Sequence, residues 1–215
     1  GMLLGQISFI MGKKNIVEVS KETTPKNTFS LKTKKYKFSS IELDRVKLIL
    51  ISSLILVIFW ASFEQAGGLL NIFAYEKTNR YLSFLNMEIP ASWFQSINPL
   101  LIIVLGYSVS VFWMFLKKKN MLATSIFKIS IGIIIMGLGF IFMVFASVES
   151  EVYGKSSMYW LFFAYLFFTI GELCASPVIL SYITKLSPKK LTASIMGIYF
   201  ATIGIGNKIA GIIGQ

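Results

Sequence analysis

Five apolar stretches, each about as long as a lipid bilayer is thick, constrain the fold of this chain more than any other feature. A transmembrane helix needs about 20 apolar residues, since it rises about 1.5 Å per residue through a hydrocarbon core of about 30 Å. Such stretches fall at about 48–73, 94–116, 126–146, 158–184 and 193–213. Charged residues make up only 14% of the chain, whereas a soluble domain carries about 25%. We therefore predict an all-α polytopic membrane protein.

The residues that are rare in this chain exclude several kinds of site. It has one cysteine, Cys174, and no histidine, so disulfide frameworks, histidine metal sites and Ser-His-Asp triads are excluded. Its only aspartate, Asp44, cannot form an aspartyl dyad, and no apolar stretch holds a nucleophile beside a base. We therefore expect neither an enzyme nor a bound cofactor.

Lysines and arginines set the predicted orientation, because cytoplasmic loops of membrane proteins carry the excess of positive charge. Ten of the 21 lie in 13–47, and others follow the second and fourth apolar stretches. Loops 12–47, 117–125 and 185–192 are therefore predicted to be cytoplasmic, in a multi-pass protein of the cell inner (plasma) membrane. The net charge of +11 suits contact with the lipid bilayer rather than nucleic acid, for which no aromatic stacking platform is present.

Both ends of the chain suggest a piece of a longer protein. Residues 1–11 are apolar but too few to span a membrane, so we interpret them as the end of a truncated transmembrane helix. The chain stops at Gln215, just where the last apolar stretch ends. Residues 48–215 would then form one helical bundle that follows the basic loop 12–47.

Two carboxylates, Glu64 and Glu172, lie inside the apolar stretches, where an ionised group is unfavourable. Counting from the centre of each stretch places both within roughly 6 Å of the membrane midplane. Two carboxylates at similar depth on different helices indicate one shared polar cavity. The alternative is that each is a protonated carboxyl group hydrogen-bonded to a neighbouring helix.

The neighbours of Glu64 favour the cavity. Gln65, Gly67 and Gly68 follow it in the sequence. Glycine at this depth permits either a close approach of helices or a local opening of the backbone, which would give the polar side chains room.

The neighbours of Glu172 also favour the cavity. Ser176 follows one helical turn later on the same face, and Pro177 removes a backbone donor, which predicts a kink. On the second stretch, Asn98 stands just before Pro99. Its amide could reach the cavity or bind backbone groups that the proline frees.

Five segments of the chain carry a resemblance to a known family. They are GMLLGQISFIMGKKN, FWASFEQAGGLLNIFA, IPASWFQSINPL, GELCASPVILSYITKLSP and MGIYFATIGIGNKIAG. In this order they resemble the end of the sixth helix and the seventh, eighth, tenth and eleventh helices of the proton-dependent oligopeptide transporter family. This family belongs to the major facilitator superfamily. The resemblance implies the C-terminal helical bundle of that fold, incomplete, with about five transmembrane helices and the end of another.

The resemblance also implies a function, the proton-coupled symport of di- and tripeptides by alternating access. By family role, Glu172 would pair with the amino terminus of the peptide. Asn98 would hold the peptide backbone, and Ser176 would lie in the same binding site. Glu64, with Gln65 beside it, would take part in proton coupling or gating.

The chain departs from the family pattern in two ways. Tyr199 stands where the family usually has tryptophan, which keeps an aromatic wall for the substrate but adds a hydroxyl group. The ExxERFxYY motif of the family's first helix is not in this chain. We therefore expect that the chain does not transport alone and needs a missing N-terminal half as its partner. The alternatives are a non-transporting helical membrane subunit, a decayed gene product, or a family member that moves another small solute such as nitrate.

Overall fold

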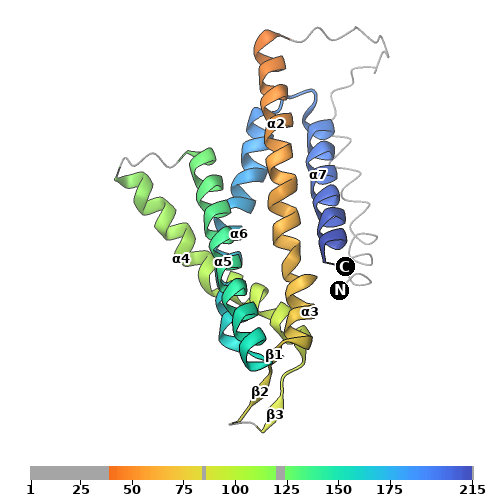
Figure 1. Cartoon of the computed structure of the whole chain (residues 1–215). Coiled ribbons are helices and arrows are strands. Elements are labelled where there is room, and N and C mark those ends of the chain that lie inside the picture. The colour runs from red at the N-terminus through yellow and green to blue at the C-terminus, as the bar shows by residue number, and fades with distance from the viewer. Residues whose placement is uncertain (1–38, 84–85, 120–123, 215) are drawn as a thin grey trace, which may run out of the picture. The chain divides into compact units, whose positions relative to one another are not determined.

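A computed structural model describes residues 39–83, 86–119 and 124–214. The predicted helix end at 1–11 and most of the predicted loop 12–47 lie outside these residues. Figure 1 shows the described part as a set of long helices. Five helical segments there are long and apolar enough to cross a membrane, which confirms the predicted number; they are Ser40–Glu76, Ala91–Lys118, Ser125–Tyr153, Met158–Leu186 and Thr192–Ile213.

Helix α2 (Ser40–Phe63) begins earlier than the apolar stretch that predicted it. Its first two turns occupy the end of the range 12–47, which the sequence predicts as loop. Helix α2 starts early because its N-terminus is capped. The Ser39 backbone N–H donates a hydrogen bond of 3.0 Å to Glu42 Oε2. A cap of this kind satisfies a donor that the first helical turn leaves free, so the helix extends into the polar segment.

The first predicted span, 48–73, is divided in the structure. After α2 come the short 3₁₀ helix η1 (Glu64–Ala66) and the helix α3 (Leu69–Glu76), with Gly67 and Gly68 between them. Glycine is a poor helix former, so the regular helix ends here. The interruption places Glu64 at the point where the helix is broken.

Helices α5 (Ser125–Tyr153) and α6 (Met158–Leu186) pack closely because glycines line their contact. A Cβ atom at Gly132 would lie 2.7 Å from the carbonyl oxygen of Gly171, and one at Gly139 would lie 2.5 Å from the ring of Phe168. Small residues at a helix contact let the backbones approach, which is the usual way in which transmembrane helices associate. Helix α6 continues through Pro177.

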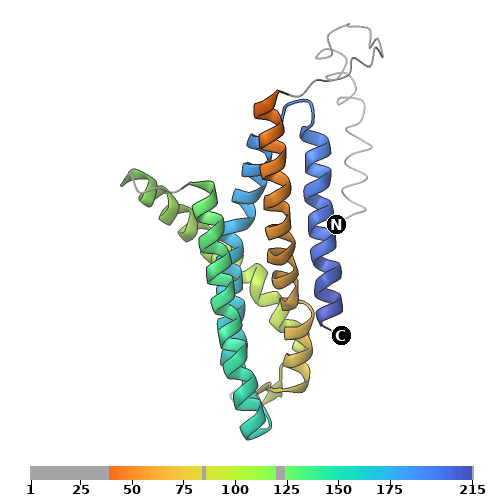
Figure 2. The same ribbon diagram turned by 45° about the horizontal axis from the view of Figure 1, so that its top comes forward.

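The other three long helices, α2, α4 (Ile97–Lys118) and α7 (Thr192–Ile213), each contact α6, and α2 and α7 also pack on each other. Helix α7 lies against α2, where a Cβ atom at Gly206 would be 2.8 Å from Trp60 Cβ. Helix α4 follows the 3₁₀ helix η2 (Ala91–Ser96) and packs on α6. Figures 1 and 2 show that α4 diverges from α5 and α6 toward its C-terminal end.

Many large apolar side chains on these helices are exposed, as expected of helices that face lipid tails. Examples are Leu54 at 71%, Ile58 at 68% and Ile103 at 78%. A soluble protein would bury such residues, because their burial is the main driving force of folding in water.

Short strands join the helices at the end of the bundle where α3 ends. β1 (Thr78–Asn79) pairs in parallel with β4 (Ser156–Ser157), and β2 (Tyr81–Leu82) pairs antiparallel with β3 (Met87–Glu88). The segments between α3 and η2 and between α5 and α6 are therefore linked by backbone pairing.

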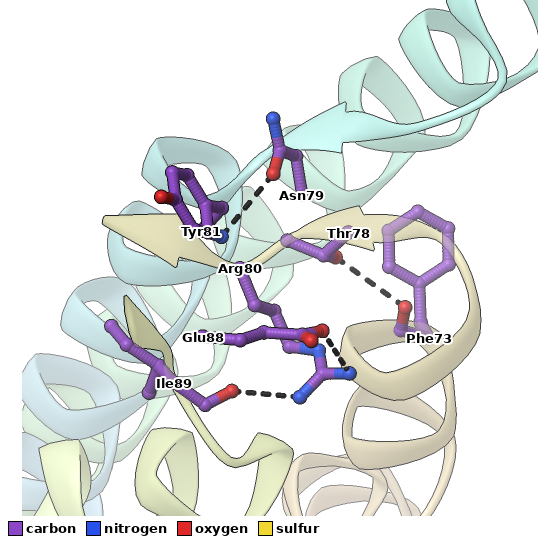
Figure 3. A network of polar contacts seen from close by, with 7 residues as sticks. All are labelled: Phe73, Thr78, Asn79, Arg80, Tyr81, Glu88 and Ile89. Atoms are coloured by element: carbon purple, nitrogen blue, oxygen red, sulfur yellow. Dashed lines mark hydrogen bonds and ion pairs between the residues drawn. The ribbon is translucent and has the colours of Figure 1, made fainter. Parts of the chain in front are cut away.

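Arg80 holds the β2–β3 segment together (Figure 3). Its Nη1 donates to the Ile89 carbonyl oxygen at 2.7 Å, and its Nη2 lies 2.7 Å from Glu88 Oε1. The guanidinium group also lies 5.4 Å from the centre of the Tyr75 ring. One side chain thus connects α3, β3 and the residue that follows β3.

Candidate functional site

The candidate site is built around a hydrogen bond between two helices. Asn98, the second residue of α4, donates from Nδ2 to Glu172 Oε2 on α6 at 3.0 Å. The same Nδ2 atom donates to Thr169 Oγ1, one turn earlier on α6, at 3.2 Å. Of the two uses that the sequence left open for Asn98, the structure shows contact with the carboxylate. The bond fixes the orientation of Glu172, which is half-buried.

A chain of polar groups continues from this contact to the broken part of the first span. Thr169 is fully buried and donates to the Tyr165 carbonyl oxygen at 2.8 Å. The Tyr165 hydroxyl donates to the Ala66 carbonyl oxygen in η1 at 2.6 Å. Asn98 on α4, the polar side chains of α6 and the backbone of η1 therefore form one connected network.

Sequence reasoning missed Tyr165 and Thr169, although a signal was present. Tyr165, Thr169, Glu172 and Ser176 follow one another at intervals of three or four residues. That spacing places them on one face of a helix. A polar stripe on an otherwise apolar helix would have identified all four together.

Glu64 is half-buried at the start of η1. It lies within electrostatic range of Glu172. Glu64 also lines a cavity of about 400 Å³ whose other walls come from α7 and the two glycines after η1. The remaining lining residues are Gly67, Gly68, Asn207, Ala210, Gly211 and Gly214. Glu172 is not among the residues that line this cavity, so one cavity shared by the two carboxylates stays a prediction.

Gln65, next to Glu64, contacts α7. It is buried, and its Nε2 donates to the Ala210 carbonyl oxygen on α7 at 3.2 Å and to the Ala61 carbonyl oxygen at 3.4 Å. Its Oε1 has no hydrogen-bond partner among the described residues. Gln65 therefore fixes η1 against α7.

The other two predicted binding residues, Ser176 and Tyr199, differ in how far they are buried. Ser176 is half-buried one turn after Glu172 on the same face of α6. Tyr199 is only 4% exposed and belongs to the packed core, with its ring next to that of Phe200. Among the described residues, no hydrogen bond joins Tyr199 to Asn98 or Glu172, and it offers little surface to a ligand.

Two lysines inside predicted spans also escaped the sequence reasoning. Lys128 is the fourth residue of α5, and Lys208 follows Asn207 near the cavity that Glu64 lines. The signal that would have found them is the one used for the carboxylates, a charge within an apolar stretch. The described residues contain no group of three or more histidines, cysteines or carboxylates that could hold a metal ion.

Comparison with known proteins gives a consistent result. Residues 11–215 match the family model described as the POT family. A peptide transporter of Yersinia enterocolitica, YePEPT, is 39% identical over 80% of this chain and 34% of its own length. A di-/tripeptide transporter of Lactococcus lactis subsp. cremoris is 27% identical over 67% of this chain and 29% of its own length.

Solved structures agree with the sequence relatives. A crystal structure of a mutant peptide transporter POT in complex with sulfate superimposes with a TM-score of 0.74 at 29% identity, over 84% of this chain and 36% of that one. A POT family transporter in complex with 5-aminolevulinic acid gives a TM-score of 0.70 at 27% identity, over 99% of this chain and 47% of that one. The chain thus spans about a third of the length of the curated relatives it matches.

Proposed function

Because the chain belongs to the POT family, we propose that it is part of a proton-coupled symporter of di- and tripeptides. Membership confirms the resemblance seen in the sequence and indicates a multi-pass membrane transporter rather than an enzyme. The observation that carries the proposal is the contact of Asn98 with Glu172, with a second carboxylate, Glu64, within electrostatic range.

Glu172 binds the amino terminus of the peptide in this proposal. A carboxylate in an apolar region needs a cationic partner or hydrogen-bond donors, and an ammonium group supplies both. Asn98, which also donates to Thr169, holds the carboxylate in place from one side. The half-buried Ser176 adds a hydroxyl group on the same helix face for the peptide backbone. Tyr199 supports this region from the core of α7, against the side chains of α2.

Glu64 couples proton binding to substrate binding. Glu64 lies within electrostatic range of Glu172, and two negative charges in a region of low polarity repel each other strongly. A proton on one of them, or an ammonium group bound to Glu172, relieves the repulsion. The state of Glu64 and the occupancy of Glu172 therefore depend on each other. Gln65 keeps η1 attached to α7, so the change at Glu64 can be passed to that helix.

Transport needs more than the matched region. The relatives are about three times as long as the part that aligns with this chain. We propose that the remaining wall of the substrate cavity comes from an N-terminal half. The protein lies in the inner (plasma) membrane, with loops 12–47, 117–125 and 185–192 in the cytoplasm, where their basic residues meet the anionic surface.

The test is proton-driven uptake of a labelled dipeptide by the complete transporter in proteoliposomes. Glu172→Gln keeps the shape of the side chain but removes its charge, so uptake is expected to fall to background while membrane insertion is unchanged. Glu151→Gln is a matched control, because Glu151 is an exposed carboxylate at the end of α5. Normal uptake by Glu172→Gln would refute the assignment. Uptake of nitrate in place of dipeptide would identify a different substrate.

A further inference from the structure

A second cavity, separate from the Asn98–Glu172 contact, lies between α4, α5 and α6. Its volume is about 440 Å³. The lining combines apolar side chains with two lysines; it consists of Gly106, Val109, Ser110, Trp113, Met114, Lys117, Lys128, Leu173, Pro177 and Val178. We refer to it as the α4–α6 groove. None of the roles proposed above uses it.

Helices α4 and α6 contact each other along one side of the groove. At Gly106 on α4, a Cβ atom would be in ordinary van der Waals contact with Leu173 Cδ2 on α6, at 4.0 Å. Figures 1 and 2 both show that α4 diverges from α5 and α6 toward its C-terminal end. The two lysines lie near that end, since Lys117 is in the last turn of α4 and Lys128 is in the first turn of α5. The groove is therefore basic near the C-terminal end of α4 and mostly apolar elsewhere.

Among the described residues, no carboxylate neutralises the positive charge in the groove. Its lining contains no aspartate or glutamate. In the described residues, the ion pairs join Lys47 to Asp44 and Arg80 to Glu88, and neither involves the lysines of the groove. The Lys128 ammonium lies 4.9 Å from the centre of the Trp113 ring, which holds it without cancelling its charge.

We propose that the α4–α6 groove binds an acidic phospholipid from the leaflet next to the loop 117–125. The phosphodiester, with one negative charge and several acceptor oxygens, lies between Lys117 and Lys128. An acyl chain follows the apolar side chains of Val109, Leu173 and Val178 toward Gly106. Basic pockets between transmembrane helices on the cytoplasmic side recognise anionic headgroups in this way. The apolar lining favours a lipid over a free anion.

The experiment uses the complete transporter in nanodiscs and brominated lipids, which quench tryptophan fluorescence on contact. The chain contains four tryptophans, so the signal of Trp113 is taken as the difference between the native protein and Trp113→Phe. Brominated phosphatidylglycerol is expected to quench Trp113 more strongly than brominated phosphatidylcholine. Each lysine should contribute about fivefold to this preference. The double variant Lys117→Gln/Lys128→Gln should lose it, and Lys128→Arg should keep it.

Matched controls separate the groove from general surface charge. Lys118→Gln/Lys119→Gln removes the same charge from the same end of α4, but neither residue lines the groove. The proposal is overturned if this pair reduces the preference as much as the groove pair does, or if the two lipids quench Trp113 equally. Absence of quenching by either lipid would mean that protein covers the groove. Loss of the preference on addition of inorganic phosphate would show that the groove binds free anions. Either of these two results would also refute a lipid site.

Discussion

Asn98 on α4 and Glu172 on α6, 74 residues apart in the sequence, are joined by a hydrogen bond of 3.0 Å. The bond links two helices that pack together within the membrane-spanning bundle. A hydrogen bond to a carboxylate is stronger than one between neutral groups, and more so where water is excluded. This contact therefore fixes the position of the charged group that we propose as the binding site for the peptide's ammonium group.

Removal of the Asn98 amide should weaken peptide binding. For Asn98→Ala we expect the KM for a dipeptide to rise roughly tenfold or more, because a hydrogen bond to a charged group contributes about 1.5–3 kcal/mol. Thr169→Val is the matched control, since it keeps the shape of the side chain and removes only the hydroxyl group that Asn98 contacts at 3.2 Å. Thr169→Val should raise the KM less than Asn98→Ala does. Uptake kinetics that are unchanged in Asn98→Ala would show that the amide does not support the carboxylate.

Glu64→Gln should separate transport from proton coupling. The variant cannot take up or release a proton at this position, so accumulation of dipeptide against a gradient should be lost. Exchange of labelled for unlabelled peptide needs no net proton movement and should survive. Both are measured in the same proteoliposomes, with and without a pH gradient. Glu76→Gln, at the exposed end of α3, is the control, and full accumulation by Glu64→Gln would contradict a coupling role.

The helices were predictable because a membrane-spanning segment must be apolar over its whole length, whatever it packs against. The same reasoning located Glu64 and Glu172, since charge in such a segment is unfavourable wherever it lies. It could not place the start of α2, which depends on the local contact of Ser39 with Glu42. Hydropathy averages over about 20 residues and does not detect a cap of one residue.

The partners of the site residues were not predictable from the sequence. Gln65 binds the backbone carbonyl group of Ala210, 145 residues away. Every residue has such a group, so the sequence does not show which one is used. Asn98 had two physically reasonable uses, and only the packing of α4 on α6 decides between them. Tyr199 was predicted as a substrate wall from a resemblance, whereas its 4% exposure results from how α7 packs on α2.

Tyr165→Phe should loosen the connection between α6 and η1. The hydroxyl group donates to the Ala66 carbonyl oxygen at 2.6 Å, and Tyr165 is 1% exposed, so water cannot replace the lost donor. We expect a loss of about 1–3 kcal/mol in the free energy of unfolding, since the partly buried Ala66 carbonyl oxygen loses its donor. Tyr159→Phe serves as the control on the same helix, because Tyr159 is 71% exposed. Thermal unfolding in detergent compares the two, and equal melting temperatures would refute the role.

Gly132→Ala should disrupt the packing of α5 on α6. Its Cβ atom would lie 2.7 Å from the Gly171 carbonyl oxygen and 2.8 Å from Ala175 Cβ, so the helices must move apart. Overpacking of this kind lowers the free energy of unfolding by about 1–3 kcal/mol. Gly137→Ala on the same helix meets no atom within 4 Å, and it should stabilise by up to about 1 kcal/mol through better helix propensity. A lower melting temperature for Gly137→Ala than for Gly132→Ala would contradict the packing shown here.

Arg80→Ala should destabilise the β2–β3 segment more than Glu88→Gln does. Arg80 is the buried member of the ion pair, with a side chain 12% exposed, whereas that of Glu88 is 56% exposed. Its loss leaves the Ile89 carbonyl oxygen without its donor at 2.7 Å and removes the contact with the Tyr75 ring, which together cost roughly 1–3 kcal/mol. Glu88→Gln keeps an oxygen that can accept from Arg80, and an exposed ion pair contributes only about 0–1 kcal/mol. Limited proteolysis between β2 and β3 should therefore accelerate in Arg80→Ala and stay near the native rate in Glu88→Gln. Equal acceleration in both would show that the ion pair, and not the bond to the backbone, holds this segment.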